Sequence, residues 1–282
     1  MKIALAALIL FGLLTGRAAL AQTALCDSLP PDKKPAVQEL LAALHPYDGC
    51  DDTFARCLAS KPVKPVVVRL ANELCRQVKA GKTRREIESL LVKRAQTLFP
   101  TGPRAPIALD ESVRAGAANA PVTVVVYACA RCPFCKLMVP ALHAAVTDGR
   151  LAGKVSLYLR PFPLKSHPGS TEGGLAFLAA AKLGRYWPFV LLSYARFDAF
   201  AATALPEWAE AVGMARPAFE RLTADPKLRD ELVAAKQEGL RNKVNATPML
   251  FINGHPYLYE LTPEAVLDVL EEAHETATVA RK

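Results

Sequence analysis

Apolar residues along this chain follow two patterns. Short apolar runs predict strands at Pro121–Tyr127, Leu151–Leu159 and Leu250–Ile252, and the first of them is rich in β-branched residues and typical of a strand buried on both faces. Helical spacing predicts a helix over residues 133–147, with one apolar stripe made by Leu137, Met138, Ala141, Leu142 and Ala145. Four or five further helices are predicted between residues 171 and 240. This order indicates an α/β domain in which a long helical segment separates the strands.

The residues ahead of this domain show helical spacing alone. Apolar stripes predict helices around Val37–Leu44 and Val67–Val78, and Gly81 is a typical helix stop. Thr83 and Glu86 form a capping box that starts another helix. The sequence Phe99-Pro100-Thr101-Gly102-Pro103 then breaks the pattern. We therefore expect a small all-α domain over residues 22–100, followed by a linker at 101–118.

The first 21 residues have the composition of a signal peptide. Lys2 precedes an uncharged apolar run over residues 3–14, and Ala19-Leu20-Ala21 matches a cleavage site. The apolar run is short for a membrane span. We expect cleavage after Ala21 and export, with the bacterial periplasm as the destination.

The chain carries a formal net charge of +8, but this charge is spread out and mixed with acidic residues. Lys82, Arg84 and Arg85 lie beside Glu86 and Glu88, for example. A run of basic residues with interleaved aromatics is missing, which argues against nucleic acid as a partner.

Four of the seven cysteines, Cys26, Cys50, Cys57 and Cys75, fall in the predicted N-terminal domain. Three or four short helices bury a thin core, and disulfides are the usual support for such a domain in an oxidising compartment. Two disulfides are therefore expected. Three connectivities are open, and proximity in the sequence favours Cys50–Cys57. A zinc site built from these cysteines and His45 is an alternative.

The other three cysteines, Cys129, Cys132 and Cys135, are evenly spaced where the predicted strand turns into a helix. Pro133 suits the first helical position, so Cys132 stands at the helix N-terminus, where free N–H groups and the helix dipole stabilise a thiolate. Cys135 lies one turn further on. This arrangement predicts a redox dithiol with Cys132 as the accessible, more acidic thiol and Cys135 as the buried one. A structural disulfide in a binding module, or a metal carried by Cys129, Cys132 and Cys135, remains an alternative.

Three separated motifs, in order, resemble the DsbA-like branch of the thioredoxin superfamily. They are Cys-Pro-Phe-Cys at 132–135, Arg160–Pro168 with Tyr186-Trp187, and Thr247-Pro248 before an apolar strand. The resemblance implies an α/β thioredoxin fold over residues 119–282 with a helical insertion at about 169–240. It also implies that Thr247, Pro248, Pro133 and Phe134 bind the substrate, and that the Thr247–Pro248 bond is cis.

The same resemblance implies a function. Cys132 and Cys135 would exchange disulfides with exported proteins, without a cofactor or a metal, and a membrane redox partner would reset the dithiol. Oxidase, isomerase and reductase directions all remain open, and the sequence does not define the oligomeric state. One position departs from the family: Val126 stands where many members carry a buried acid.

Overall fold

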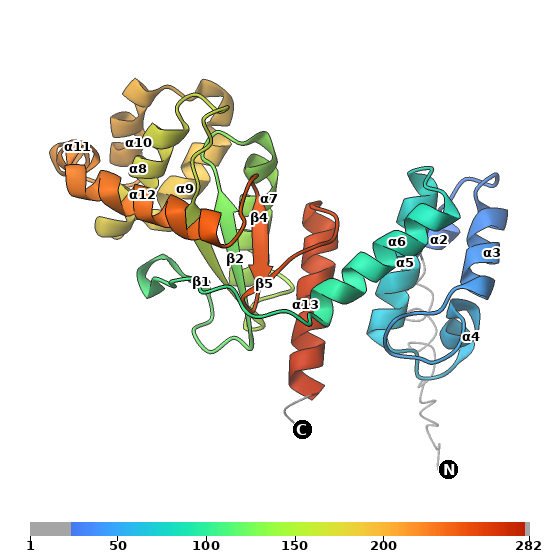
Figure 1. Ribbon diagram of the computed structural model, residues 1–282. Helices are drawn as coiled ribbons and strands as arrows, with labels where there is room; N and C mark the ends of the chain where they lie inside the picture. Colours follow the sequence, from blue (N-terminus) through green and yellow to red (C-terminus); the bar gives the residue numbers. More distant parts are fainter. Residues whose placement is uncertain (1–23, 280–282) are drawn as a thin grey trace, which may run out of the picture. The chain divides into compact units, whose positions relative to one another are not determined.

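The computed structural model describes residues 24–279, so the predicted signal peptide at 1–21 lies outside the described residues. The chain forms two units, residues 1–91 and 92–282 (Figure 1). The boundary falls inside helix α6 (Arg84–Leu98), a few residues before the end at residue 100 that the sequence predicts for the helical domain. Within the described residues, none of the helices is both long and apolar enough to cross a membrane.

The first unit is helical, as the apolar stripes indicate. Its helices ahead of α6 are α2 (Ala24–Asp27), α3 (Lys34–Ala43), α4 (Phe54–Ala59) and α5 (Pro65–Lys79). The predicted capping box starts α6: the Glu86 carboxylate accepts a hydrogen bond from the Thr83 backbone N–H at 2.8 Å. The core is small and contains Phe54, Leu70 and Leu74, all fully buried.

Two disulfides close this small core. One joins Cys26 on α2 to Cys75 on α5, and the other joins Cys50 to Cys57 on α4, which is the proximal pair that the sequence analysis favoured. Both half-cystines on α4 and α5 are buried within the apolar cluster. The disulfides therefore fix the short helices around a core that is too small to hold them firmly by itself.

Replacing both Cys26 and Cys75 with alanine is expected to lower the free energy of unfolding of the first unit by about 4 kcal/mol, because this bridge closes a long loop in the unfolded chain, with a sequence separation of 49 residues. Removal of Cys50–Cys57, with a separation of 7 residues, should cost about 2 kcal/mol. Urea unfolding followed by far-ultraviolet circular dichroism measures both. Trp187 and Trp208 lie in the second unit, so their fluorescence reports that unit separately. A larger loss for the short loop than for the long one would contradict the loop-closure argument.

A five-stranded mixed sheet forms the centre of the second unit, in the order β1-β3-β2-β4-β5. The strands are β1 (Ala115–Gly116), β2 (Val122–Ala128), β3 (Val155–Pro161), β4 (Met249–Ile252) and β5 (His255–Pro256). β2 lies in the middle, parallel to β3 and antiparallel to β4. Six of its seven residues are buried, which confirms the prediction of a strand covered on both faces.

Helices cover the sheet and form the insertion. α7 (Pro133–Thr147) and α13 (Pro263–Val279) pack against each other and against β2. The insertion consists of α8 (Ser170–Lys182), α9 (Tyr186–Ala195), α10 (Leu205–Ala211), α11 (Arg216–Ala224) and α12 (Pro226–Arg241), with short 3-10 turns η2 (Phe197–Ala199) and η3 (Ala202–Ala204). Trp187, Trp208 and Phe219 are buried in it, and Phe177 on α8 makes edge-to-face contacts with three rings of α9. This confirms the thioredoxin fold with a helical insertion.

The segment expected to be a linker, residues 101–118, is instead built into the second unit. The Ala105 N–H donates to the Gly254 carbonyl oxygen at 2.7 Å, and the Trp187 indole N–H donates to the Val113 carbonyl oxygen at 2.9 Å. The segment also contains the turn η1 (Glu111–Val113) and the edge strand β1. The segment was predicted to be a linker because it begins with proline and glycine, and because its strand β1 is only two residues long and gives no recognisable strand pattern.

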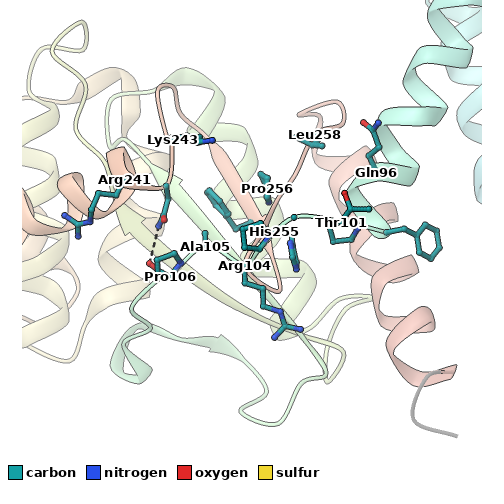
Figure 2. A pocket seen from close by; sticks show the side chains of 16 residues that line it. Gln96, Thr101, Arg104, Ala105, Pro106, Arg241, Lys243, His255, Pro256 and Leu258 are labelled. Atoms are coloured by element: carbon teal, nitrogen blue, oxygen red, sulfur yellow. Dashed lines mark hydrogen bonds between the residues drawn. The ribbon is translucent and has the colours of Figure 1, made fainter.

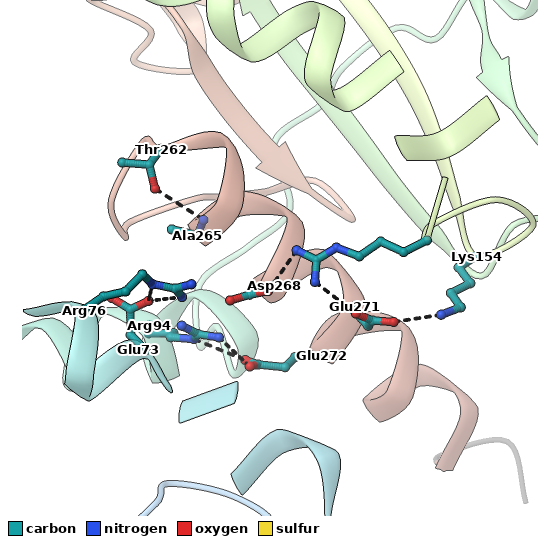
Figure 3. Close-up of polar contacts among 10 residues, drawn as sticks. Glu73, Arg76, Arg94, Lys154, Thr262, Ala265, Asp268, Glu271 and Glu272 are labelled. Carbon is teal, nitrogen blue, oxygen red and sulfur yellow. Dashed lines mark hydrogen bonds and ion pairs between the residues drawn. The ribbon is translucent and has the colours of Figure 1, made fainter. Parts of the chain in front are cut away.

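Ion pairs attach α13 to the rest of the second unit (Figure 3). Arg94, fully buried on α6, pairs with buried Glu272 on α13 at 2.5 Å. Nearer the surface, Arg150 pairs with Asp268 at 2.8 Å, and Lys154 pairs with Glu271 at 2.8 Å. Because Arg94 and Glu272 are both removed from water, their pairing compensates charges that burial would otherwise destabilise.

Candidate active site

The three central cysteines lie at the C-terminal end of β2 and the start of α7. Cys132 has extended backbone angles and is the residue immediately before α7, and Pro133 is the first helical residue. The Cys132 N–H donates to the Cys129 carbonyl oxygen at 3.1 Å, which closes a tight turn between strand and helix. The structure thus places Cys132 at the helix N-terminus that the sequence predicts.

The pKa of the Cys132 thiol is lowered from 9.0 to about 5. The largest cause is a hydrogen bond from the Cys135 thiol, and smaller contributions come from the Thr247 side chain and from the backbone N–H groups of Cys135 and Phe134. These donors outweigh the effect of burial, which acts in the opposite direction. Cys132 is therefore a thiolate at neutral pH when the dithiol is reduced.

Cys135 has the opposite character. Burial is the main reason that its pKa is raised far above the ordinary value, and the neighbouring negative charge of Cys132 adds to the effect. In the reduced protein Cys135 therefore keeps its proton and donates it in a hydrogen bond to the Cys132 thiolate. The two thiols share one charge, and it resides on Cys132.

One expectation about Cys132 is wrong. The sequence analysis placed its sulfur within reach of solvent, but Cys132 is only 1% exposed and Cys135 is 0% exposed. The reason is the loop that contains Thr247, which lies directly against Cys132: the Cys132 Sγ is 3.1 Å from the Thr247 carbonyl oxygen, to which it can donate only when it carries its proton. Acidity, rather than exposure in the free protein, distinguishes the two thiols.

The Thr247–Pro248 peptide bond is cis, as the sequence analysis expected. The loop reaches Cys132 because β4 follows it directly and pairs with β2, with Met249 opposite Tyr127. The Thr247 hydroxyl is buried without a hydrogen-bond partner among the described residues. It nevertheless lies near enough to both sulfurs to help lower the pKa of Cys132.

An exposed apolar surface lies beside the dithiol on the first two turns of α7. Phe134 is 67% exposed and Leu137 is 62% exposed. Leu137 was expected in the buried stripe of this helix, but Met138 and Leu142 are buried while Leu137 faces outward. Large apolar side chains that are exposed together next to a reactive group indicate a binding surface.

The structure also identifies residues that the sequence analysis missed. Arg131, just before Cys132, lies over the rings of Phe197 and Phe200, with its guanidinium carbon 4.6 Å from each ring centroid, and donates to the Phe197 carbonyl oxygen at 2.6 Å. Lys136, just after Cys135, pairs with Asp198 at 2.7 Å. The 3-10 turn η2 of the insertion is therefore attached to both sides of the dithiol. No local pattern could reveal contacts between residues more than sixty positions apart.

Cys129 has no disulfide partner and is buried. Its sulfur lies 3.4 Å from Nδ1 of His167, and burial raises the pKa of the thiol. His167 belongs to the tight turn between β3 and α8, where its N–H donates to the Leu164 carbonyl oxygen at 3.0 Å. Over residues 24–279, groups of three or more His, Cys, Asp and Glu side chains that could hold a metal ion were not found.

Two buried polar side chains, Tyr194 and Glu238, lie near β2. This strand has Val126 at the position where many members of the family have a buried acidic residue. The Tyr194 hydroxyl donates to the Cys129 carbonyl oxygen at 3.2 Å, and its pKa is raised by burial and then by the nearby Cys135. Glu238 on α12 accepts a hydrogen bond from Tyr127 at 2.9 Å and pairs with Arg160 at 3.0 Å. Glu238 thus supports the residue next to Val126, while Tyr194 lies close to the thiols.

Comparison with known proteins agrees with this fold. The model of a thioredoxin family matches residues 109–272, more than half of the chain, and the chain belongs to this family. Two solved structures are similar to it in fold. Wolbachia pipientis alpha-DsbA1 is 20% identical, with a TM-score of 0.52 over 63% of this chain and 98% of that protein. BdbD from Bacillus subtilis is 16% identical, with a TM-score of 0.51 over 58% of this chain and 92% of that protein.

Curated relatives match in sequence over part of their length. The Na(+)/H(+) antiporter NhaA 3 of Salinispora tropica is 29% identical over 173 residues, which is 60% of this chain but 26% of that protein. NhaA 1 of Mycolicibacterium gilvum is 29% identical over 146 residues, 49% of this chain and 23% of that protein. The chain therefore spans about a quarter of these relatives. It has the fold of the thioredoxin family, to which the matching family model assigns it.

Proposed function

We propose that the chain is an exported thiol–disulfide oxidoreductase that exchanges disulfides with other exported proteins through Cys132 and Cys135. The observation that carries this proposal is the division of charge between the two thiols. Cys132 has a pKa lowered to about 5, while Cys135 beside it has a raised pKa and keeps its proton. A structural thiol pair has no need for such a difference, whereas disulfide exchange requires one good nucleophile and leaving group.

In the oxidising direction, a substrate thiolate attacks the Cys132 sulfur of the Cys132–Cys135 disulfide. The bond between the two cysteines breaks, its electron pair goes to Cys135, and Cys135 takes up a proton. A second thiolate of the substrate then attacks the substrate sulfur of the mixed disulfide, and Cys132 leaves as a thiolate. The substrate gains a disulfide and the dithiol is reduced. The low pKa of Cys132 favours this second step, because a stable thiolate leaves readily.

The acidity of Cys132 also bears on direction. A pKa of about 5 lies between the values of about 3.5 for DsbA and about 7 for thioredoxin. A stabilised thiolate stabilises the reduced form, which makes the oxidised form a stronger oxidant. We therefore place the reduction potential between about −270 mV, the thioredoxin value, and about −120 mV, the DsbA value.

We propose that the substrate chain binds along the Thr247–Pro248 loop, with Pro133, Phe134 and Leu137 as its apolar contacts. The loop precedes β4, so an extended segment can use its backbone in the manner of an added strand. Phe134 and Leu137 are exposed and apolar, so they can contact the apolar side chains that an unfolded substrate protein exposes. Since Cys132 is covered in the free protein, the loop must shift slightly as substrate approaches the sulfur.

The periplasm is the proposed location, and a membrane redox partner is proposed to reset the dithiol after each turnover. The signal-like sequence at 1–21 and the two disulfides of the first unit support export to an oxidising compartment. The chemistry uses thiols alone, so no cofactor or metal is invoked.

A direct test uses a reduced, unfolded model protein with several cysteines. The oxidised chain is expected to form disulfides in it stoichiometrically, and the rate of loss of free thiols measures the reaction. Cys129→Ala is the matched control, because it removes a thiol of the same loop while leaving the dithiol intact. If Cys132→Ala reacted as fast as the unaltered chain, the proposed function would be wrong.

The absorbance of the reduced protein at 240 nm, which reports thiolate, is expected to rise with a midpoint near pH 5. Because the pKa is lowered by folding, the thiolate stabilises the reduced protein fully above the ordinary value of 9.0, and this contribution is lost as the pH falls through about 5. The transition should vanish in Cys132→Ala. Thr247→Val should shift the midpoint upward, since it removes a nearby hydroxyl that lowers the pKa of Cys132. A midpoint above pH 8 in the unaltered chain would contradict the assignment.

A further inference from the structure

A cleft of about 590 Å³ lies in the second unit, away from the dithiol. Its walls are the extended segment Pro100–Pro106, the end of α12 at Arg241–Lys243, and the β4–β5 hairpin with Leu258 after it (Figure 2). None of the residues assigned to disulfide exchange lines it. Its volume lies within the range of sites for small molecules.

The lining of the cleft is mainly apolar, although Gln96, Thr101, Asn242 and His255 also belong to it. Phe251, at 1% exposure, belongs to its lining, and Phe99 and Leu258 each remain 47% exposed beside it. Several proline rings, including Pro103 and Pro106, complete the walls. Large apolar side chains left in contact with water around a concave surface gain free energy when an apolar body covers them.

The charged residues of the cleft are all basic. Arg104, Arg241 and Lys243 line it, and no aspartate or glutamate does. Within the part of the chain that the structure describes, ion pairs involving these three residues were not found, in contrast to Arg94, Arg150 and Arg160 in the same unit. In Figure 2 the Lys243 side chain extends in the direction of Pro256 and Leu258. Lys243 also has a left-handed backbone (φ 64°) after α12, where glycine or asparagine is usual.

The walls offer few backbone groups to a peptide. Pro100, Pro103, Pro106 and Pro256 have no N–H. The Ala105 N–H already donates to Gly254, and the Pro106 carbonyl oxygen accepts from the Asn242 side chain at 3.3 Å. A polypeptide strand, which binds mainly through backbone hydrogen bonds, would therefore find little to pair with here.

We propose that this cleft binds a free small molecule that joins an anionic group to an apolar body. The apolar body covers Phe99, Phe251 and Leu258, and the anionic group lies near Lys243. This site is separate from the dithiol, and the inference is independent of the proposed redox function.

The probe for the test is 2-naphthoate, a rigid aromatic carboxylate, titrated into the full mature chain by calorimetry. Saturable one-site binding is expected with a Kd below about 1 mM, and 2-naphthamide, of the same shape without the charge, should bind at least about tenfold more weakly. Amide chemical shifts of the labelled chain should change around Lys243, His255 and Leu258 and leave those of α8–α11 unchanged.

Variants locate the site. Arg104→Gln with Lys243→Gln, and separately Leu258→Ser, should each weaken naphthoate binding at least about tenfold. Arg221→Gln and Val233→Ser, an exposed cation and an exposed apolar residue outside the cleft, are the matched controls and should change Kd by less than about twofold. Equal binding of the amide, shift changes elsewhere, or equal effects of the control variants would overturn the proposal. Binding to anionic phospholipid vesicles without binding to free naphthoate would overturn it as well.

Discussion

Replacing Cys135 with alanine is expected to trap substrate proteins on Cys132 as long-lived mixed disulfides. Cys135 is the thiol that would resolve such an adduct, and without it the Cys132–substrate bond persists. Cys132→Ala should show neither activity nor adducts, a loss of at least about a thousandfold in exchange rate, because the remaining thiols are buried and protonated. Non-reducing gels of protein isolated from cells show the adducts as high-mass bands that disappear on reduction.

The Cys129→Ala variant is the control for this experiment. Cys129 lies three residues from Cys132, but its sulfur forms a hydrogen bond with Nδ1 of His167. It should retain activity and accumulate no adducts. Adducts that persist in Cys132→Ala and depend on Cys129 or Cys135 would show that the roles have been assigned to the wrong sulfurs.

The second large effect concerns stability. Glu272→Ala should lower the free energy of unfolding of the second unit by about 3–5 kcal/mol, because it removes the buried carboxylate that pairs with the fully buried Arg94 guanidinium. Urea unfolding followed by the fluorescence of Trp187 and Trp208, both in this unit, measures the loss.

Two further variants separate charge from packing. Glu271→Ala, on the same helix, breaks ion pairs with Arg150 and Lys154, whose side chains are about a third exposed. It should lower the free energy of unfolding by less than about 1 kcal/mol. Arg94→Leu combined with Glu272→Leu removes both buried charges, and should be considerably more stable than Glu272→Ala alone. A double variant as unstable as Glu272→Ala would show that packing, rather than an uncompensated charge, accounts for the loss.

The parts of the site that the sequence predicted are those governed by local rules. A β-branched run before Cys132 and a proline after it define a strand that turns into a helix. The free N–H groups of the helix N-terminus contribute to the low pKa of that cysteine, although the Cys135 thiol contributes more. The Cys50–Cys57 pair followed from proximity in the chain. The Thr247–Pro248 loop was located through its resemblance to a family, because spacing alone does not bring residues 115 positions apart together.

The parts that the sequence did not predict depend on tertiary contacts. The covering of Cys132 results from the approach of the Thr247 loop, and the attachment of Arg131 and Lys136 to η2 results from the folding of the insertion. The spacing of Leu137 fits the apolar stripe of α7, but only part of that stripe is buried. Met138 and Leu142 are covered, and Leu137 is exposed. The edge strand β1 is too short to produce an alternating pattern.

The reduction potential of the Cys132–Cys135 pair tests the central claim most directly. The chain is equilibrated in glutathione buffers of graded potential, and free thiols are then trapped and located by peptide mapping. Cys132 and Cys135 should convert together in one two-electron step, between about −270 and −120 mV, while Cys129 stays reduced throughout. A pair that remained oxidised below about −300 mV would behave as a structural disulfide, and would contradict a role in disulfide exchange.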